Sequence, residues 1–245
     1  MRKARLFSQR GYYHVMIRGV NKQNIFYEDE DKEYFKYLMK KFGKKLKIVF
    51  HTYVIMDNHV HFLFYDRDKY LSKFMQILCS VYARYFNRKY DRVGHLFGDR
   101  FVSEPLDTNS SILSACRYIL QNPEKAGICK ASEYKWSSYN CYKRKQNLID
   151  TSLITSFFKS INDLYKFMNE NNEDDFIDIE LRASEKQKAA IDLIKKILNS
   201  ENPIIDPSLP KIEIIKKLQK LKQTRLSINT ISRITGIGRY LIQIS

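Results

Sequence analysis

The stretch KIVFHTYVIMDNHVHFLFY, residues 47–65, decides the fold of the first part of the chain. It contains two runs of β-branched and aromatic residues, a composition that favours strands. Between the runs lies Asp57-Asn58, a pair that favours a turn. We therefore predict an antiparallel hairpin with strands at residues 47–56 and 59–65.

The second strand of this hairpin presents two different faces, because successive side chains of a strand point in opposite directions. Val60, Phe62 and Phe64 share one face and should belong to a core. His59 and His61 share the other face, about 6.5–7 Å apart along the strand. Two imidazoles at that distance can converge on one divalent ion and leave positions open for phosphate oxygens and water. The alternative is a pair of ordinary histidines, one buried and one exposed, since an H-x-H sequence often occurs by chance.

The remainder of the first part alternates between strand and helix patterns. Apolar spacing, turn residues and caps predict a strand at 12–17, a helix at 31–42, a helix at 71–90, a strand beginning at Leu106, and a helix from Asn109 or Ser110 to Pro123. With the hairpin included, the order of elements is β-α-β-β-α-β-α. This order predicts an α+β fold, in which a ferredoxin-like antiparallel sheet carries its helices on one face.

Charge divides the chain into parts. Lys and Arg outnumber Asp and Glu by 43 to 27, which gives a net charge of +16 over 245 residues. Such a charge favours a polyanionic partner such as nucleic acid, although composition alone fits a generically Lys-rich protein equally well. The acidic run NENNEDD at residues 169–175 separates two basic bodies. We therefore expect a first domain at residues 1–149, an acidic connector at 150–184 and a small all-helical domain at 185–245.

The last domain shows helical patterns and no strand pattern. Apolar spacing along residues 212–221 predicts one helix. The sequence SINTISRITGIGRYLIQ at 227–243 predicts a helix, a glycine turn and a second helix. Ser227 is the expected N-cap of the first of these helices, and Gly236 is the expected break.

This pair of helices resembles the helix-turn-helix of resolvases and replication initiators. The resemblance implies contact with duplex DNA from the second helix, through Gly238, Arg239 and Gln243. The alternative is a helical hairpin that packs on the first domain or on another subunit.

The predicted helix at residues 110–122 carries a tyrosine outside its apolar arc. On a helical wheel the arc consists of Ile112, Leu113, Cys116, Ile119 and Leu120. Tyr118 falls well off this arc, beside small polar residues, so its hydroxyl has room for a substrate. Asn122 lies one turn further on, where its amide oxygen could be a third metal ligand. The alternative for Tyr118 is a surface tyrosine, since the chain has 17 tyrosines.

Basic side chains that could contact DNA gather near the end of the long helix and in the loop after it. The candidates are Arg18, Arg84, Arg88, Lys89, Arg92 and Arg100. Tyrosines and phenylalanines lie among them and could stack on unpaired bases. For the helical arginines, a solvated helix face is an equally good interpretation.

Several motifs occur together and in order along residues 8–145. They are YHVMIRGVN at 13–21, HVH at 59–61, YARYFNR at 82–88, GHLFGDRF at 94–101, RYILQNP at 117–123 and WSSY at 136–139. In this combination the chain resembles the single-tyrosine HUH transposases, and most of all the group associated with repetitive extragenic palindromes (REP). Ordered motifs at this spacing are much more specific than HVH alone.

The resemblance implies the ferredoxin-like HUH endonuclease fold and an activity on single-stranded or hairpin DNA. It implies that His59, His61 and Asn122 bind Mg²⁺ or Mn²⁺. Tyr118 matches the family's nucleophile, which attacks a phosphodiester and leaves a 5′-phosphotyrosine and a free 3′-hydroxyl. Tyrosine suits this step only with assistance, because its ordinary pKa is near 10.

Two other functions remain open at this stage. One is a DNA-binding regulator that kept the fold and lost catalysis, although the intact His59, His61, Tyr118 and Asn122 set argues against that loss. The other is a metal-dependent DNA hydrolase in which water is the nucleophile and no covalent intermediate forms. The sequence also leaves open whether the protein is a monomer or a homodimer.

The cysteines and the apolar runs bear on the cellular compartment. The four cysteines form no C-x-x-C pair and no zinc-ligand spacing. No signal peptide precedes them, so we expect reduced thiols in a cytoplasmic protein, with Cys79 and Cys116 in the core. No apolar run is long enough to span a membrane, so we expect no membrane association.

Overall fold

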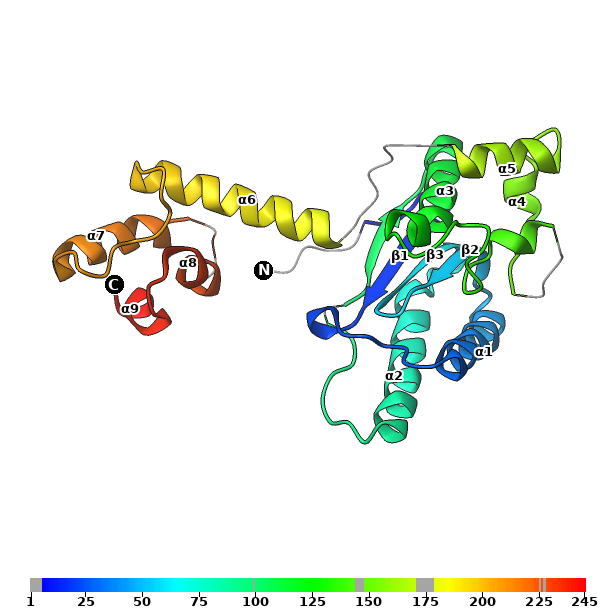
Figure 1. Cartoon of the computed structure of the whole chain (residues 1–245), viewed down its shortest axis with the longest axis horizontal. Helices are drawn as coiled ribbons and strands as arrows, with labels where there is room; N and C mark the ends of the chain where they lie inside the picture. The colour runs from blue at the N-terminus through cyan, green and yellow to red at the C-terminus, as the bar shows by residue number, and fades with distance from the viewer. Residues whose placement is uncertain (1–5, 99, 144–147, 171–178, 225, 227) are drawn as a thin grey trace. The chain divides into compact units, whose positions relative to one another are not determined.

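The chain forms two compact units, residues 1–176 and 177–245, each with a core of its own (Figure 1). The boundary between the two units, at residues 176 and 177, falls inside the predicted connector at 150–184. Within the described residues, no helix combines the length and the apolar character needed to cross a membrane. The structure is a computed structural model that describes residues 6–98, 100–143, 148–170, 179–224, 226 and 228–245.

The first unit is built on an antiparallel sheet of four strands in the order β2-β3-β1-β4. The predicted hairpin is confirmed, since β2 and β3 pair directly and the amide of Met56 donates to the carbonyl of His59 at 2.9 Å. The last strand ends at Pro105 instead of beginning at Leu106, as a short edge strand beside β1. The strands are β1 (Tyr12–Arg18), β2 (Val49–Ile55), β3 (His59–Tyr65) and β4 (Val102–Pro105).

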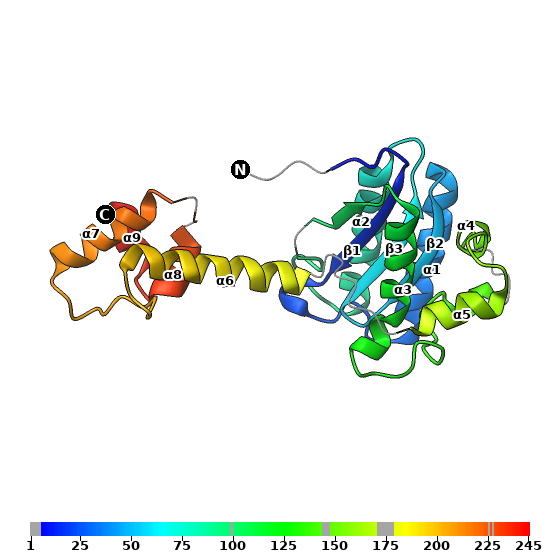
Figure 2. The ribbon, with the colours of Figure 1, turned by 90° about the horizontal axis from the view of Figure 1, so that it is seen from above.

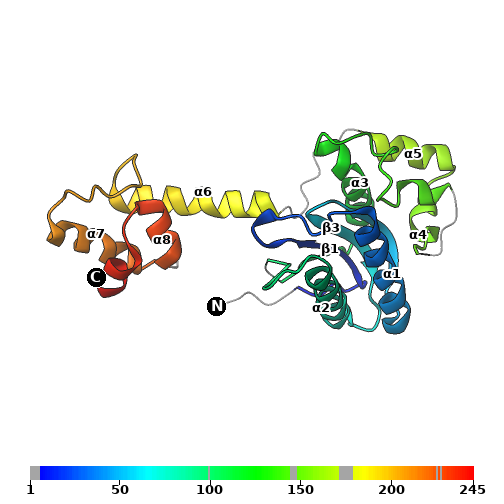
Figure 3. The ribbon, with the colours of Figure 1, turned by 60° about the horizontal axis from the view of Figure 1, so that its bottom comes forward.

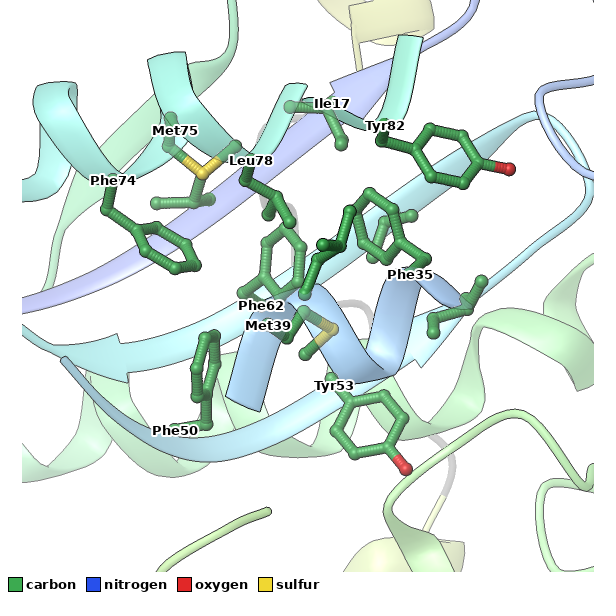
Figure 4. Close-up of a cluster of buried hydrophobic side chains, with 14 of the residues drawn as sticks. Ile17, Phe35, Met39, Phe50, Tyr53, Phe62, Phe74, Met75, Leu78 and Tyr82 are labelled. Carbon is green, nitrogen blue, oxygen red and sulfur yellow. The ribbon is translucent and has the colours of Figure 1, made fainter. Parts of the chain in front are cut away.

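Two helices, α1 (Asp29–Leu46) and α2 (Leu71–Lys89), cover one face of this sheet. The predicted core face of β3 is confirmed, because Phe62 is fully buried against them. Its ring centroid lies 6.3 Å from that of Phe35 in α1 and 6.0 Å from that of Phe50 in β2 (Figure 4). Burial of this aromatic cluster is the main apolar contribution on this side of the sheet.

Helix α3 (Asn109–Lys125) packs on the opposite face of the sheet (Figure 3). The α+β fold class is confirmed, but the helices cover both faces rather than one. The reason is that Val54 of β2 and Leu63 of β3 are apolar on this second face and need cover. Cys116 of α3 is buried as expected, whereas Cys79 is only half-buried against the first cluster.

Helix α3 runs through Pro123 instead of ending there. The proline removes the backbone hydrogen bond that an amide at position 123 would donate to the carbonyl of Ile119, yet the helix continues to Lys125. The final turn closes where the amide of Ala126 donates to the carbonyl of Asn122 at 2.9 Å. Asn122 therefore remains within the helix.

Part of the predicted acidic connector belongs to the first unit. It forms α4 (Ser152–Thr155) and α5 (Ile161–Asn169), and α5 lies beside α3 (Figure 2). Leu164 and Met168, one helical turn apart, are buried in the cluster under α3. Gln121 of α3 fixes the end of α5 by donating to the Met168 carbonyl at 2.8 Å. Most of the acidic run, residues 171–175, lies outside the described residues.

The described residues of the second unit form helices joined by loops and contain no strand, as predicted. Ile194, Leu218, Ile231 and Ile242, one from each helix, meet in its core. Gly236 has a φ of +78°, a conformation that glycine adopts without strain, so the predicted glycine break is confirmed. The predicted N-cap Ser227 lies outside the described residues. The helices are α6 (Ile179–Leu198), α7 (Lys211–Lys222), α8 (Ile228–Thr235) and α9 (Arg239–Ile244).

Replacing Phe62 with Ala should lower the free energy of unfolding of the first unit by about 3–5 kcal/mol, the usual effect of a deleted core aromatic ring. Urea denaturation followed by tryptophan fluorescence measures this, because Trp136 is the chain's one tryptophan and belongs to the same cluster. Val93→Ala is the control, since Val93 is 99% exposed. An effect of Phe62→Ala no larger than that of the control would contradict the described core.

Candidate active site

The two histidines of β3 lie side by side on the face that α3 covers. Their ring centroids are 5.1 Å apart and the rings are nearly perpendicular. His61 is only 1% exposed, whereas His59 at the start of the strand is half-exposed. The pair therefore has a buried member and a member that solvent can reach.

Each of these rings is held through its Nδ1 atom. Nδ1 of His59 lies 2.5 Å from Oδ1 of Asn58 in the hairpin turn. Nδ1 of His61 lies 2.9 Å from Nε2 of His14 in β1, and the two rings are stacked with centroids 5.2 Å apart. A histidine held at Nδ1 in this way presents Nε2 to a metal ion.

Burial keeps His61 in its neutral form. Burial is the largest cause that lowers the pKa of His61 well below 6.5, and the neighbouring His59, His14 and Arg18 lower it further. Desolvation acts in this direction because it disfavours the charged imidazolium. At neutral pH His61 is therefore an uncharged imidazole, the form that binds metal ions.

Tyr118 of α3, the helix that covers this face of the sheet, contacts two of the histidine rings. Its ring centroid lies 5.7 Å from those of His61 and His14, edge-on to both. The sequence predicted that the Tyr118 hydroxyl has open space beside small polar residues. This prediction is wrong, because Tyr118 is only 7% exposed. The C-terminal half of α3 is enclosed on both flanks, by the histidines on one side and by α5 beside Gln121 on the other.

Asn122 lies one turn after Tyr118 and is half-buried. Its Nδ2 donates to the Tyr118 carbonyl at 2.9 Å, so this bond uses the amide nitrogen and not the amide oxygen. Oxygen is the atom with which an asparagine binds a divalent ion.

These donors fit an open metal site better than a closed one. In the described part of the chain, no group of three or more His, Cys, Asp or Glu side chains is arranged to hold a metal ion. Two imidazoles and one amide oxygen would leave further positions to water and phosphate oxygens. Such incomplete coordination is typical of catalytic sites, whereas structural sites are fully closed by protein ligands.

Three further residues near the site were not identified from the sequence. Lys125 brings its ammonium group to 4.8 Å from the centroid of the Tyr118 ring. His14 stacks on His61, and Glu104 of β4 lies 3.9 Å from Nδ1 of His14. A histidine on the non-core face of β1 was a usable signal for His14. No local sequence pattern could identify Glu104, because its position beside His14 depends on the pairing of β4 with β1.

Two of the predicted DNA-binding residues lie near the end of the sheet that carries His59. Arg18 is directly opposite His59 in the β1–β3 register. The Arg18 carbonyl accepts a hydrogen bond from the amide of Gly98 at 3.1 Å, which holds the glycine-rich loop beside this end of the sheet. Arg100 in the same loop is exposed.

The remaining basic candidates of the first unit have different surroundings. Arg84 and Arg88 are exposed on α2. Arg92 donates to Oε1 of Gln23 at 2.6 Å, a contact that fixes the loop. The ammonium group of Lys89 lies 3.1 Å, 2.8 Å and 3.0 Å from the carboxylates of Glu28, Glu30 and Asp31. Lys89 therefore joins α2 to the start of α1, and its local charge balance argues against the expected DNA contact.

The candidates of the second unit lie together at its last helix. Gly238 immediately precedes α9, Arg239 is its first residue and Gln243 is near its end. All three are exposed. Their placement after the Gly236 turn is the one that the sequence predicted.

Comparison with known proteins supports the same fold. The first unit matches the family described as "Transposase IS200 like" over residues 7–122. Similar solved structures include a REP-associated tyrosine transposase bound to a REP hairpin, with a TM-score of 0.55 and 13% identity over 72% of this chain and 94% of the other. A proposed transposase from Deinococcus radiodurans R1 has a TM-score of 0.35 and 15% identity over 45% and 89%. No curated protein matches the chain.

The family match covers the residues of the site described above except Lys125, which lies just beyond it. His14, His59, His61, Glu104, Tyr118 and Asn122 all lie within it. The similar hairpin-bound transposase confirms that a four-stranded antiparallel sheet with helices is the fold of this unit. Over residues 7–122, the first unit of this chain is similar to the IS200-like transposase family.

Proposed function

We propose that this transposase nicks and rejoins single-stranded DNA, with Tyr118 as the nucleophile beside a divalent ion at His59 and His61. The observation that carries the proposal is the 5.7 Å distance between the ring centroids of Tyr118 and His61. The two residues come from α3 and β3, which are far apart in the sequence. A nucleophile and metal-ligand candidates thus meet within the reach of one phosphodiester.

The proposed reaction exchanges one phosphoester for another. The Tyr118 oxygen attacks phosphorus, the bond from phosphorus to the 3′ oxygen breaks, and the 3′ oxygen takes up a proton. The products are a 5′-phosphotyrosine and a free 3′-hydroxyl. Attack by a 3′-hydroxyl reverses the step and rejoins DNA without an external energy source. The positive charge of Lys125 over the tyrosine ring suits a phenol that becomes an anion.

The family also suggests a divalent metal ion, which we assign to His59, His61 and Asn122. Mg²⁺ or Mn²⁺ there would polarise the phosphate and stabilise the leaving oxygen. The residues suit this role because His61 is neutral and both imidazoles are oriented by hydrogen bonds.

We propose hairpin or other single-stranded DNA as the substrate. The support is the overall charge of +16 and the fold shared with a transposase that is described as bound to a REP hairpin. Arg18 and Arg100, at the end of the sheet near His59, are the best-placed phosphate contacts. Arg84 and Arg88 could extend the contact along α2.

We further propose that the second unit binds duplex DNA through α9. Its support is the glycine turn at Gly236, which leads directly into a helix with Arg239 and Gln243 exposed. Nicking would then require only the first unit, and the second unit would add affinity for duplex sites.

Tyr118→Phe should abolish the covalent protein–DNA adduct, because it removes the attacking oxygen. The measurement is a denaturing gel after incubation of labelled hairpin DNA with the protein and Mn²⁺. Tyr139→Phe is the matched control, because Tyr139 is also a buried tyrosine of the cluster under α3. Cleavage without an adduct in the unsubstituted protein would favour a hydrolase, and binding without cleavage would favour a regulator.

His61→Ala should lose nicking while it keeps its affinity for hairpin DNA, because the imidazole serves the metal ion and not the DNA backbone. Nicking rates with Mn²⁺ and hairpin affinity by fluorescence anisotropy measure the two effects. His95→Ala is the control, since His95 is exposed in the glycine-rich loop. Unimpaired nicking by His61→Ala would remove the metal assignment.

Arg239→Ala and Gln243→Ala should each weaken binding to a duplex site by about 1–3 kcal/mol, the usual value of a specific base contact. Nicking of hairpin DNA should remain unchanged. Binding of the full chain to a selected duplex measures the effect, and Lys211→Ala on α7 controls for the loss of one positive charge. Equal affinities in all variants would discredit α9 as a DNA-reading helix.

A further inference from the structure

Three polar side chains lie in a line across adjacent strands on the face that α3 covers. Glu104 of β4 is the direct partner of His14 of β1 in the sheet register. Oε2 of Glu104 lies 3.9 Å from Nδ1 of His14, and Nε2 of His14 lies 2.9 Å from Nδ1 of His61. The line therefore ends on the more buried of the two proposed metal ligands.

The burial of His14 requires an explanation. His14 is 2% exposed and sits in the middle of β1, where its neighbours Tyr13 and Val15 fill the core on the other face. A polar group in such a position is unfavourable unless a partner satisfies it, and an aliphatic residue would serve packing better. His61 is one such partner, because its Nδ1 lies 2.9 Å from Nε2 of His14, so each ring helps to satisfy the other.

The order of donors and acceptors along this line follows from Glu104. A carboxylate only accepts hydrogen bonds and attracts positive charge, so it favours the proton of His14 on Nδ1, although 3.9 Å is an electrostatic contact and not a hydrogen bond. Nε2 of a neutral His14 is then an acceptor. Nδ1 of His61 must donate to it, and Nε2 of His61 carries the lone pair.

We propose that His14 and Glu104 are positioning residues, which hold His61 in the tautomer and orientation that a divalent ion requires. This inference rests on the proposed metal site. The same His14 ring lies edge-on to Tyr118, at a centroid distance of 5.7 Å. His14 thus contacts both the proposed ligand and the proposed nucleophile, and it fixes their separation.

The first test is Mn²⁺ affinity of the full chain, measured by the electron paramagnetic resonance signal of free Mn²⁺. His14→Leu keeps an apolar side chain of similar size without an acceptor, and it should weaken Mn²⁺ binding by about 10–100-fold. His14→Gln places an amide oxygen near the former Nε2 and should restore most of the affinity. Glu104→Gln, which removes the charge, should have a smaller effect of the same sign.

The matched control is His51→Leu. His51 is a buried histidine of the same sheet, 4% exposed, and its Nδ1 lies 2.9 Å from the carbonyl oxygen of Asp150, away from the site. This variant suffers a comparable change in packing and should bind Mn²⁺ as the unsubstituted protein does. Unchanged affinity for hairpin DNA in each variant shows that it is folded.

The second test is the tautomer of His61 itself, which packing alone would not set. In metal-free protein labelled with nitrogen-15 histidine, the imidazole shifts of His61 should show the proton on Nδ1. This preference should weaken in His14→Leu and return in His14→Gln. The imidazole signal that disappears in His61→Ala is assigned to His61.

The outcomes separate the two proposals. Wild-type Mn²⁺ affinity in His14→Leu, together with an unchanged His61 tautomer, would overturn the positioning role. Mn²⁺ binding that survives His61→Ala would reject the proposed metal site instead, and the tautomer measurement alone would then decide whether His14 positions His61.

Discussion

Strand β3 is covered on both faces, and the geometry of the site depends on this constraint. On one face Phe62 packs against α1 and α2, which fixes the position of the strand in the sheet. On the other face α3 covers Leu63 and encloses His61 together with Tyr118. Because side chains alternate strictly along a strand, the packing of the aromatic face determines where the histidine face lies.

Because the site is enclosed, its buried imidazoles need hydrogen-bond partners within the protein. A buried imidazole without partners is unfavourable, and each ring of the site has one, from Asn58 in the turn or from His14 in β1. The same low-polarity surroundings keep His61 uncharged, since they lower its pKa. The sheet therefore supplies orientation and charge state together, before any substrate arrives.

Local patterns were sufficient to predict some elements and insufficient for others. The β2–β3 hairpin, the apolar face of β3 and the glycine turn at Gly236 follow from short-range signals, and the structure confirms them. The face on which α3 packs does not follow, because an apolar arc shows that a helix is covered but not by which side of a sheet. The ion pairs of Lys89 and the neighbours of His14 depend on contacts between distant segments. The nearness of Tyr118 to the histidines was expected only from the family resemblance.

Helix α5 gives the tyrosine helix a support that lies outside the family match, which ends at residue 122. Gln121 donates to the carbonyls of Met168 and Glu170, and Leu164 is buried in the same cluster as Tyr118. A chain shortened to the shared region would keep every catalytic candidate but would leave the outer flank of α3 bare to water. The packing that supports the tyrosine helix therefore extends beyond the residues that the family match covers.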